Sequence, residues 1–313
     1  MENLLFIGGA GFIGSNIINH LVSQNSNKKI FVFEPEFANI SSISNQSVTI
    51  IRGMLSDTEL IDSIIKTNGI SKVVHLVSTM VPGSTFEHYT DEFEHVIFPT
   101  IKLMQLCSKV NIQFVYFSSG GTVYGNRKSL ESFEETDPKE PISYYGLSKQ
   151  MIENSIQFEH RVSNLEYLIL RPSNPYGHGQ RIFGKQGLIA VSIGKILTGG
   201  VINVWGDGTS IRDYIYIDDL VKIVSQIFDS GVKNATINIG SGKGYSVNSI
   251  ISILKGIVSE NVNVIYTTER KADVSNMILN NTLLNSIVDI EFTTLKQGIT
   301  DFYLSEKKKL NHD

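Results

Sequence analysis

The sequence predicts an α/β fold in which a doubly wound parallel sheet is joined to a smaller mixed α/β lobe. Two observations lead to this prediction. Short apolar runs rich in β-branched and aromatic residues recur through the first half of the chain, and most lack the alternation of a half-exposed strand, as is typical of strands buried on both faces. Helical stretches separate these runs, and strand–helix alternation at this spacing gives a parallel sheet with helices on both faces.

Six runs are expected to form the sheet, and the helix after the third is expected to start at a capping box formed by Ser56 and Glu59. From about Asn174 the pattern loosens, since glycine and asparagine become frequent and short strand-like pieces mix with helices. The six runs are 4–7, 30–33, 48–51, 73–77, 114–117 and 167–170. The expected division is a domain of residues 1–173 and 211–237 and a lobe of residues 174–210 and 238–313.

The composition excludes several classes of protein. The 313 residues include 27 basic and 31 acidic ones, a net charge of −4, without the basic face that nucleic-acid binders carry. No apolar run reaches the length needed to cross a membrane, and we expect no secretory leader before the first strand. The single cysteine, Cys107, lies in an apolar stretch, so we expect a buried thiol, no disulfide and no metal site, in a cytoplasmic protein.

The first strand is followed at once by a glycine-rich turn that opens a helix. Gly8, Gly11 and Gly14 allow positive φ angles and a close approach of the backbone. The helix N-terminus, with Phe12 and Ile13 in its first turn, offers free N–H groups to a pyrophosphate. In this strand–turn–helix context the motif predicts a dinucleotide site on a Rossmann-like sheet.

An acidic residue ends the second strand. Glu34 lies where a carboxylate accepts hydrogen bonds from both hydroxyls of the adenosine ribose and repels a 2′-phosphate. The sequence therefore favours NAD over NADP as the cofactor, although Glu36 is close enough to leave the register open. We expect Val77, Ser118 and Pro172 to line the same cofactor site.

In a chain with 12 tyrosines, about one Tyr-x-x-x-Lys pair is expected by chance, and this chain has three. The spacing alone therefore does not identify a catalytic pair. Placement favours Tyr145 and Lys149, because a helix that opens after the fifth strand carries residues i and i+4 on one face, toward the carboxyl edge of the sheet. The lysine and a positive nicotinamide are expected to lower the pKa of the phenol, so that both residues serve catalysis and the cofactor site. The other pairs are Tyr124 with Lys128, in a loop, and Tyr303 with Lys307, near the C-terminus.

Together these motifs carry a family resemblance. The glycine turn, the segment Ser118–Gly125 and the Tyr145/Lys149 pair resemble the extended short-chain dehydrogenase/reductase family, within it the nucleotide-sugar epimerases, dehydratases and 4-ketoreductases. The resemblance covers nearly the whole chain and implies a nucleotide-diphosphate sugar as substrate. It also implies a homodimer formed by helices at about 92–110 and 144–162. Phe98, Leu103 and Met151 are candidates for its interface.

Later motifs resemble the parts of this family that hold the substrate. The segment Arg171–Gly177 resembles a loop whose asparagine meets the diphosphate, and Trp205–Tyr214 resembles a segment with a phosphate-binding arginine. Val204 lies where members of the family have a residue that stacks on or flanks the base. The Arg-x-x-Asp formed by Arg270 and Asp273 resembles a family motif that holds phosphate and ribose. Two separated arginines suit a diphosphate because guanidinium forks match phosphate oxygens. The implied substrate residues are Asn174, Val204, Arg212, Arg270 and Asp273.

The sequence departs from the family at one catalytic position. Gly120 stands where a serine or threonine normally hydrogen-bonds the reacting oxygen of the sugar. Ser119 and Thr122 are the candidate replacements, and we favour Thr122 because side chains two apart on a strand face the same way. No carboxylate pair follows, as the family's 4,6-dehydratases require. The acidic residue that usually contacts adenine is also missing, with 53–55 reading Gly-Met-Leu.

These observations and the resemblance imply an NAD-dependent 4-epimerase. Such an enzyme inverts C4 of a UDP-hexose or UDP-N-acetylhexosamine through a transient 4-keto intermediate, with Tyr145 as the proton acceptor. The alternative is an NAD(P)H-dependent 4-ketoreductase of a dTDP- or UDP-4-keto-6-deoxy sugar, in surface-polysaccharide precursor synthesis. A non-catalytic NAD(H)-binding sensor is a third reading, supported only by Gly120.

Overall fold

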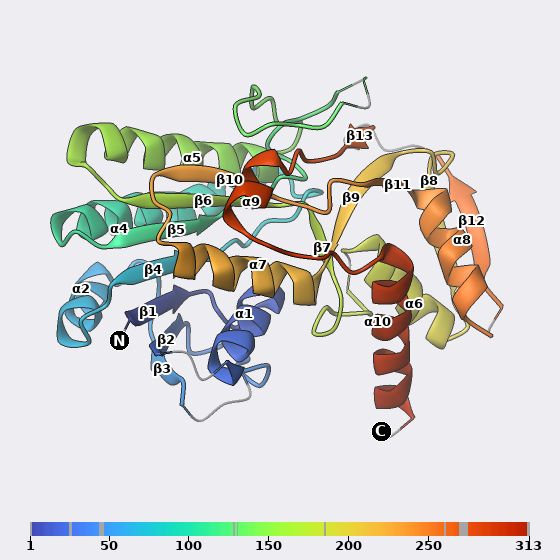
Figure 1. Ribbon diagram of the computed structural model, residues 1–313, viewed down its shortest axis with the longest axis horizontal. Coiled ribbons are helices and arrows are strands. Elements are labelled where there is room, and N and C mark those ends of the chain that lie inside the picture. Colours follow the sequence, from blue (N-terminus) through green and yellow to red (C-terminus); the bar gives the residue numbers. More distant parts are fainter. Residues whose placement is uncertain are drawn as a thin grey trace.

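A seven-stranded parallel sheet forms the centre of the computed structural model (Figure 1). The strand order is β3-β2-β1-β4-β5-β6-β10, and all six expected runs lie in this sheet. The strands are β1 (Glu2–Ile7), β2 (Lys28–Glu34), β3 (Thr49–Arg52), β4 (Lys72–His75), β5 (Gln113–Phe117), β6 (Tyr167–Pro172) and β10 (Ala235–Ile239). The structure describes residues 2–24, 27–43, 47–127, 129, 131–184, 186–259, 261–268 and 275–311.

Helices cover both faces of the sheet, which is why its strands read as nearly continuous apolar runs. On one face α1 (Phe12–Ser23) packs beside α7 (Ile217–Ser230) over a core that includes Leu4 and Phe6. On the other face lie α2 (Thr58–Thr67), α4 (Phe98–Lys109) and α5 (Tyr144–Ser163), over a core that includes Leu5 and Ile7. The short helix α3 (Phe86–Glu92) and a π-helix, η1 (Phe93–Ile97), lead into α4.

The strand order reverses between β1 and β4. The chain builds the sheet from β1 toward β3 and then continues on the opposite side of β1 with β4, β5 and β6. At such a switch point the loops that follow the two strands part and leave a crevice at the carboxyl ends, which is where parallel α/β sheets bind ligands.

The smaller lobe sits beyond this edge of the sheet (Figure 1). Its central strand is β9, which pairs in parallel with β7 and β13 and antiparallel with β11, while β8 pairs with β12. The strands are β7 (Asn174–Tyr176), β8 (Val201–Trp205), β9 (Ile211–Tyr216), β11 (Gly244–Ser246), β12 (Asn263–Thr267) and β13 (Asn276–Met277). The helices of the lobe are α6 (Leu188–Leu197), α8 (Val247–Ile257) and α10 (Leu295–Leu310), whereas α9 (Thr282–Ile287) packs against β10 and α7 (Ile217–Ser230) of the large domain (Figure 1).

The chain passes between the two parts more than once. Only Ser173 separates β6 of the large sheet from β7 of the lobe, and after β9 the chain returns to the large sheet through α7 and β10. The strand β9 begins at residue 211, where we expected the large domain to resume, but all its partners belong to the lobe. Among the described helices, none is long and apolar enough to cross a membrane.

Candidate active site

The glycine turn closes tightly against the neighbouring strand. Gly8 has φ +78°, and a Cβ on it would lie 2.7 Å from the Cγ2 of Val77, so only glycine fits there. Gly11, the N-cap of α1, is different, because a Cβ there would meet nothing closer than the carbonyl of Gly8 at 4.0 Å. Gly11 therefore faces open space, beside the unpaired N–H groups of the first helical turn.

That space is a cavity of about 380 Å³ at the carboxyl ends of β1, β2 and β4. Glu34 lines it and is buried, and its Oε1 accepts a hydrogen bond of 2.6 Å from the backbone N–H of Ala10. Burial raises the pKa of Glu34, and the Ala10 hydrogen bond opposes that rise. Glu36 is exposed and does not line the cavity, so Glu34 is the residue in the expected position. Val77, Phe37 and Met54 also line the cavity.

A second cavity, of about 850 Å³, contains most of the expected catalytic residues. The glycine-turn helix, the loop after β5, the start of α5 and the loop after β6 all contribute to its wall. Of the expected residues it is lined by Phe12, Ile13, Ser118, Ser119, Thr122, Tyr145, Pro172 and Asn174. The side chains of Val81, Gln180 and Gln186 line it as well, although no sequence motif marked them.

Tyr145 lies in the first turn of α5. Ser143 caps this helix by accepting a hydrogen bond from the N–H of Gly146 at 3.2 Å. One turn later, Lys149 is buried, and its Nζ donates a 3.1 Å hydrogen bond to the carbonyl of Phe117 at the end of β5. Its Nζ is 5.6 Å from the centroid of the Tyr145 ring. The helix thus brings phenol and ammonium to the same edge of the sheet, as expected.

Tyr124 and Tyr303, the tyrosines of the other two Tyr-x-x-x-Lys pairs, line neither of these two cavities. Tyr124 is buried, donates to the Oδ1 of Asn238 at 2.6 Å and accepts from Arg171 at 2.7 Å, and Lys128 lies outside the described residues. In α10, the Nζ of Lys307 donates to the hydroxyl of Tyr303 at 3.0 Å.

Burial dominates the electrostatics of the catalytic pair. It raises the pKa of Tyr145 to about 12, a rise that hydrogen bonding by Ser119 opposes and the charge of Glu92 adds to. Burial also lowers the pKa of Lys149 to about 8, against the charges of Glu92 and Glu153. Without the cofactor, the net shift in the pKa of the phenol is therefore upward and not downward as we expected, because desolvation outweighs the hydrogen bonding by Ser119.

The hydroxyl beside Tyr145 is that of Ser119, and the reason given above for Thr122 was wrong. The strand β5 ends at Phe117, so residues 120–123 form a turn and the alternation of a strand does not apply. Thr122 still lines the cavity, and its Oγ1 is buried with no hydrogen-bond partner among the described residues. Ser119 is the side chain whose hydrogen bonding lowers the pKa of Tyr145.

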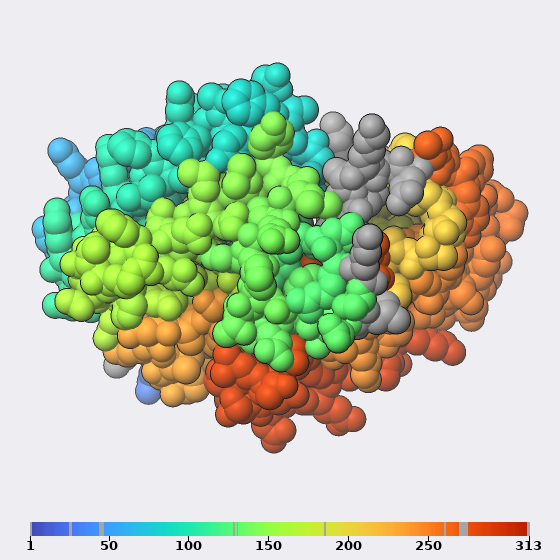
Figure 2. All heavy atoms as spheres, turned by 90° about the horizontal axis from the view of Figure 1, so that it is seen from above, coloured from blue at the N-terminus to red at the C-terminus, as the bar shows by residue number. Residues whose placement is uncertain are grey.

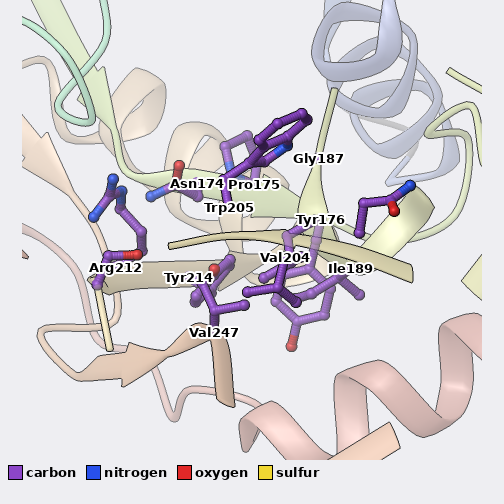
Figure 3. A pocket seen from close by; sticks show the side chains of 13 residues that line it. Asn174, Pro175, Tyr176, Gly187, Ile189, Val204, Trp205, Arg212, Tyr214 and Val247 are labelled. Atoms are coloured by element: carbon purple, nitrogen blue, oxygen red, sulfur yellow. The ribbon is translucent and has the colours of Figure 1, made fainter. Parts of the chain in front are cut away.

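A third cavity, of about 240 Å³, lies in the lobe and adjoins the second (Figure 3). The two cavities are neighbours, because Asn174, Pro175 and Gly187 line both of them. In Figure 3 the guanidinium of Arg212 stands at one end of the row of side chains and Ile189 toward the other. Asn174 is fixed by a hydrogen bond of 2.7 Å from its Nδ2 to the carbonyl of Asp213.

Aromatic and apolar side chains complete this third cavity. Val204, which we expected near the base, is buried in the wall of this cavity. Three residues that we did not predict as site residues also line it: Trp205, whose ring is half-exposed, Tyr214 and Val247. Trp205 is the only tryptophan of the chain and directly follows Val204, which is a signal that the sequence contained. Arg270 and Asp273, the other two expected substrate residues, lie outside the described residues.

Known proteins share both this fold and this sequence pattern. A family model described as the NAD dependent epimerase/dehydratase family matches residues 4–240. The chain is 31% identical over 297 residues, 95% of each chain, to a Methanocaldococcus jannaschii protein assigned as a UDP-glucose 4-epimerase. It is 33% identical over 258 residues, 81% of each chain, to the dTDP-4-dehydro-6-deoxyglucose reductase of Escherichia coli.

Among solved structures, a UDP-glucose 4-epimerase from Thermotoga maritima, determined with UDP-glucose, superposes with a TM-score of 0.90 and 28% identity. The match covers 98% of this chain and 99% of that one. With the family model matching more than half of the chain, and with relatives above 30% identity along most of its length, the chain belongs to the NAD dependent epimerase/dehydratase family and is an NAD-dependent enzyme.

Proposed function

We propose that this enzyme is a 4-epimerase of a UDP-hexose or UDP-N-acetylhexosamine that acts through a transient 4-keto sugar. The observation that carries the proposal is that the cavity of Tyr145 and the cavity of Arg212 lie next to each other, with Asn174 in the wall of both. A sugar at the first and a diphosphate at the second correspond to the two ends of a nucleotide sugar. The absence of a carboxylate beside Thr122 argues against a 4,6-dehydratase.

The cavity at the glycine turn fits NAD. Gly11 leaves room for a pyrophosphate at the start of α1, and Glu34 offers a second carboxylate oxygen besides the one that Ala10 binds. Val77 would contact the bound cofactor there, while Phe12, Ile13, Ser118 and Pro172 would contact it in the neighbouring cavity. Bound there, NAD would supply the site that takes up the hydride of C4 and gives it back.

Tyr145 is the group that exchanges a proton with O4 of the sugar. Because its pKa is about 12 among the protein's own groups, Lys149 included, its deprotonation needs a further positive charge, which the oxidised nicotinamide ring would provide. Ser119 supplies the hydroxyl that family members carry at position 120, and Thr122 lies close enough in the wall to bond the sugar as well. The fully buried Cys107 takes no part.

The lobe holds the nucleotide. Arg212 and Asn174 bind the diphosphate, and Val204 with Trp205 borders the base. Arg270 and Asp273 are proposed to complete the site from the family resemblance. The large sheet thus binds the cofactor and the lobe binds the nucleotide sugar. The large domain also includes α7 and β10, which come from the second half of the chain.

One comparison favours a second candidate. The Escherichia coli relative at 33% identity is a 4-ketoreductase, and the same Tyr145 would then donate its proton to the 4-keto oxygen. Purified enzyme given UDP-glucose or UDP-N-acetylglucosamine without added cofactor should yield the C4 epimer. Consumption of NADH or NADPH with a 4-keto-6-deoxy sugar nucleotide, and no epimer from either UDP-sugar, would instead identify the reductase.

We also propose a homodimer formed by the helices that carry and precede Tyr145. Phe93, Phe98, Phe158 and Val162 expose large apolar surfaces there, and α5 (yellow-green) and the segment 86–109 (teal) both reach the surface in Figure 2. Leu103 is not part of this face, because only 1% of it is exposed and it lies on the buried side of α4, in the core. We place the enzyme in the cytoplasm, in the synthesis of surface-polysaccharide precursors.

A further inference from the structure

Glu92 is a buried carboxylate at the end of α3, with 1% of its surface exposed. Its Oε1 accepts hydrogen bonds from the hydroxyls of Ser78 at 3.1 Å and Ser148 at 3.4 Å. Its Oε2 accepts from the backbone N–H of Thr79 at 2.9 Å and from the hydroxyl of Thr79 at 2.5 Å. Glu92 therefore ties α3 to the loop after β4, which lines the cofactor cavity, and to α5.

All of these donors are neutral. None of the described lysines and arginines lies within ion-pair distance of Glu92. Removing an ionised carboxylate from water costs several kcal/mol unless a nearby positive charge offsets the loss, so an isolated carboxylate here would be costly. Hydrogen bonds from neutral groups offset only part of that cost.

Lys149 presents the complementary situation. It is 3% exposed, and the hydrogen bond that its Nζ makes goes to the neutral carbonyl of Phe117. The other carboxylate nearby, Glu153, already has two cations, since Arg171 bonds it at 2.7 and 2.9 Å and Lys139 at 3.0 Å. Glu92 has no such cation among the described residues, and it accepts its hydrogen bond from Ser148, the residue directly before Lys149 in α5.

We propose that Glu92 is a positioning residue for the reaction, whose carboxylate is the counter-charge that keeps Lys149 protonated beside Tyr145 and fixes the Ser78–Thr79 loop against α5. The proposal rests on the proposed function only in assigning Tyr145 and Lys149 to proton transfer. The π-helix η1, which begins at the next residue, suits this role, because wide turns of this kind are frequent at functional sites.

The surrounding charges give the proposal a distinctive signature. Glu92 opposes the fall in the pKa of Lys149 and adds to the rise in the pKa of Tyr145, so its removal lowers both pKa values. The groups that face Lys149 are Glu92, Glu153, His75, Tyr116 and Tyr145. Of these, His75 is neutral with a pKa of about 3, Tyr116 stays protonated because its pKa is raised well above 10, and Glu153 is held ionised by Arg171.

The test is the pH profile of kcat/KM for Glu92→Gln, a variant that keeps the shape of the side chain and removes its charge. Both limbs of the profile should move to lower pH, by about one unit. The KM for the nucleotide sugar should stay the same, since Glu92 lines none of the three cavities. Ser148→Ala is the matched control: it removes one hydrogen bond to Glu92 without changing a charge, so both limbs should stay in place.

A folded Glu92→Gln enzyme with reduced kcat and unmoved limbs would overturn the proposal, because a merely structural role predicts that result. A second measurement does not need activity. The loss of Tm caused by Glu92→Gln should be smaller in a Lys149→Met background than in the natural chain, and fully additive losses would refute the pairing. This comparison of Tm values tests the interaction between Glu92 and Lys149 even if the enzyme is a reductase, because it does not depend on epimerase activity.

Discussion

Leu279 fills the space that a side chain on residue 120 would need. A Cβ on Gly120 would lie 2.6 Å from the Cδ1 of Leu279 and 2.9 Å from the carbonyl oxygen of Arg171. Gly120 therefore does not leave an empty space where the family has a serine or threonine, because Leu279, from the segment after β13, occupies that space.

This contact predicts the outcome of restoring the family's residue. Gly120→Ser should lower the free energy of unfolding by about 1–3 kcal/mol, since overpacking displaces Leu279 or the β6 backbone. Gly120→Ser combined with Leu279→Ala should recover part of that loss. Chemical denaturation of the natural chain and the two variants measures these free energies, and a Gly120→Ser protein as stable as the natural chain would contradict the packing argument.

Ser119 and Thr122 should differ in their effect on turnover. Ser119→Ala should reduce kcat/KM by about 10²-fold, as the loss of one donor beside a developing charge does. It should also move the limb that reports Tyr145 to higher pH, because hydrogen bonding by Ser119 lowers the pKa of that phenol. Thr122→Val should cost less. The assignment fails if Thr122→Val is the more damaging variant in steady-state assays.

Glu34 should control the choice of cofactor. Glu34→Ser removes the carboxylate that binds the N–H of Ala10 and that would repel a 2′-phosphate, so NAD retention should fall about tenfold or more while NADP binding improves. Quantifying the nucleotide bound after purification measures both. Glu36→Ser, at an exposed position outside the cavity, should leave cofactor content unchanged, and a comparable loss there would show that the register is wrong.

Arg212 should act on substrate binding more than on turnover. Arg212→Ala should raise the KM for the nucleotide sugar about 10- to 100-fold, because charge-assisted hydrogen bonds to phosphate contribute 1.5–3 kcal/mol each. The KM of Arg212→Lys should lie between those of the natural chain and Arg212→Ala, since lysine keeps the charge but lacks the planar guanidinium fork. Arg161→Ala, at an exposed position in the last turn of α5, provides the control for loss of positive charge.

The dimer is tested by charging its proposed face. Phe98 and Phe158 are 50% and 53% exposed, so Phe98→Glu and Phe158→Glu should leave the fold intact and shift the protein to the mass of a monomer in light scattering. Leu304→Glu, equally exposed but on α10, is the control and should not change the mass. A dimer that persists in both phenylalanine variants would place the interface elsewhere.

The sequence predicted the sheet well because each strand is a local feature. Six apolar runs and a glycine turn need no knowledge of distant residues, and Tyr145 could be chosen among three pairs from its place after the fifth strand. Local capping was less predictable. The helix α2 begins at Thr58 after Asp57, whose Oδ2 accepts from the N–H of Met54, and the expected box at Ser56 does not form.

Contacts between distant segments could not be predicted. Leu279 and Gly120 meet because the bridge between Phe133 and Leu279 brings the end of the lobe against the loop after β5, and nothing local in either segment signals it. Glu92 was missed for another reason. It stands among several acidic residues in a stretch where a π-helix breaks the ordinary 3.6-residue period, so periodicity did not mark it as buried.

The passage from β6 to β7 through the single residue Ser173 has a consequence for how the sugar must move. Pro172, at the wall of the catalytic cavity, and Asn174, at the wall of the nucleotide cavity, are two residues apart, so the chain fixes their separation to less than about 7 Å. This spacing therefore stays nearly constant during a catalytic cycle. A hexose that is to present both faces of C4 is therefore expected to turn about its own link to the diphosphate and not by a change in this spacing, so an extra residue inserted at 173 should strongly reduce turnover.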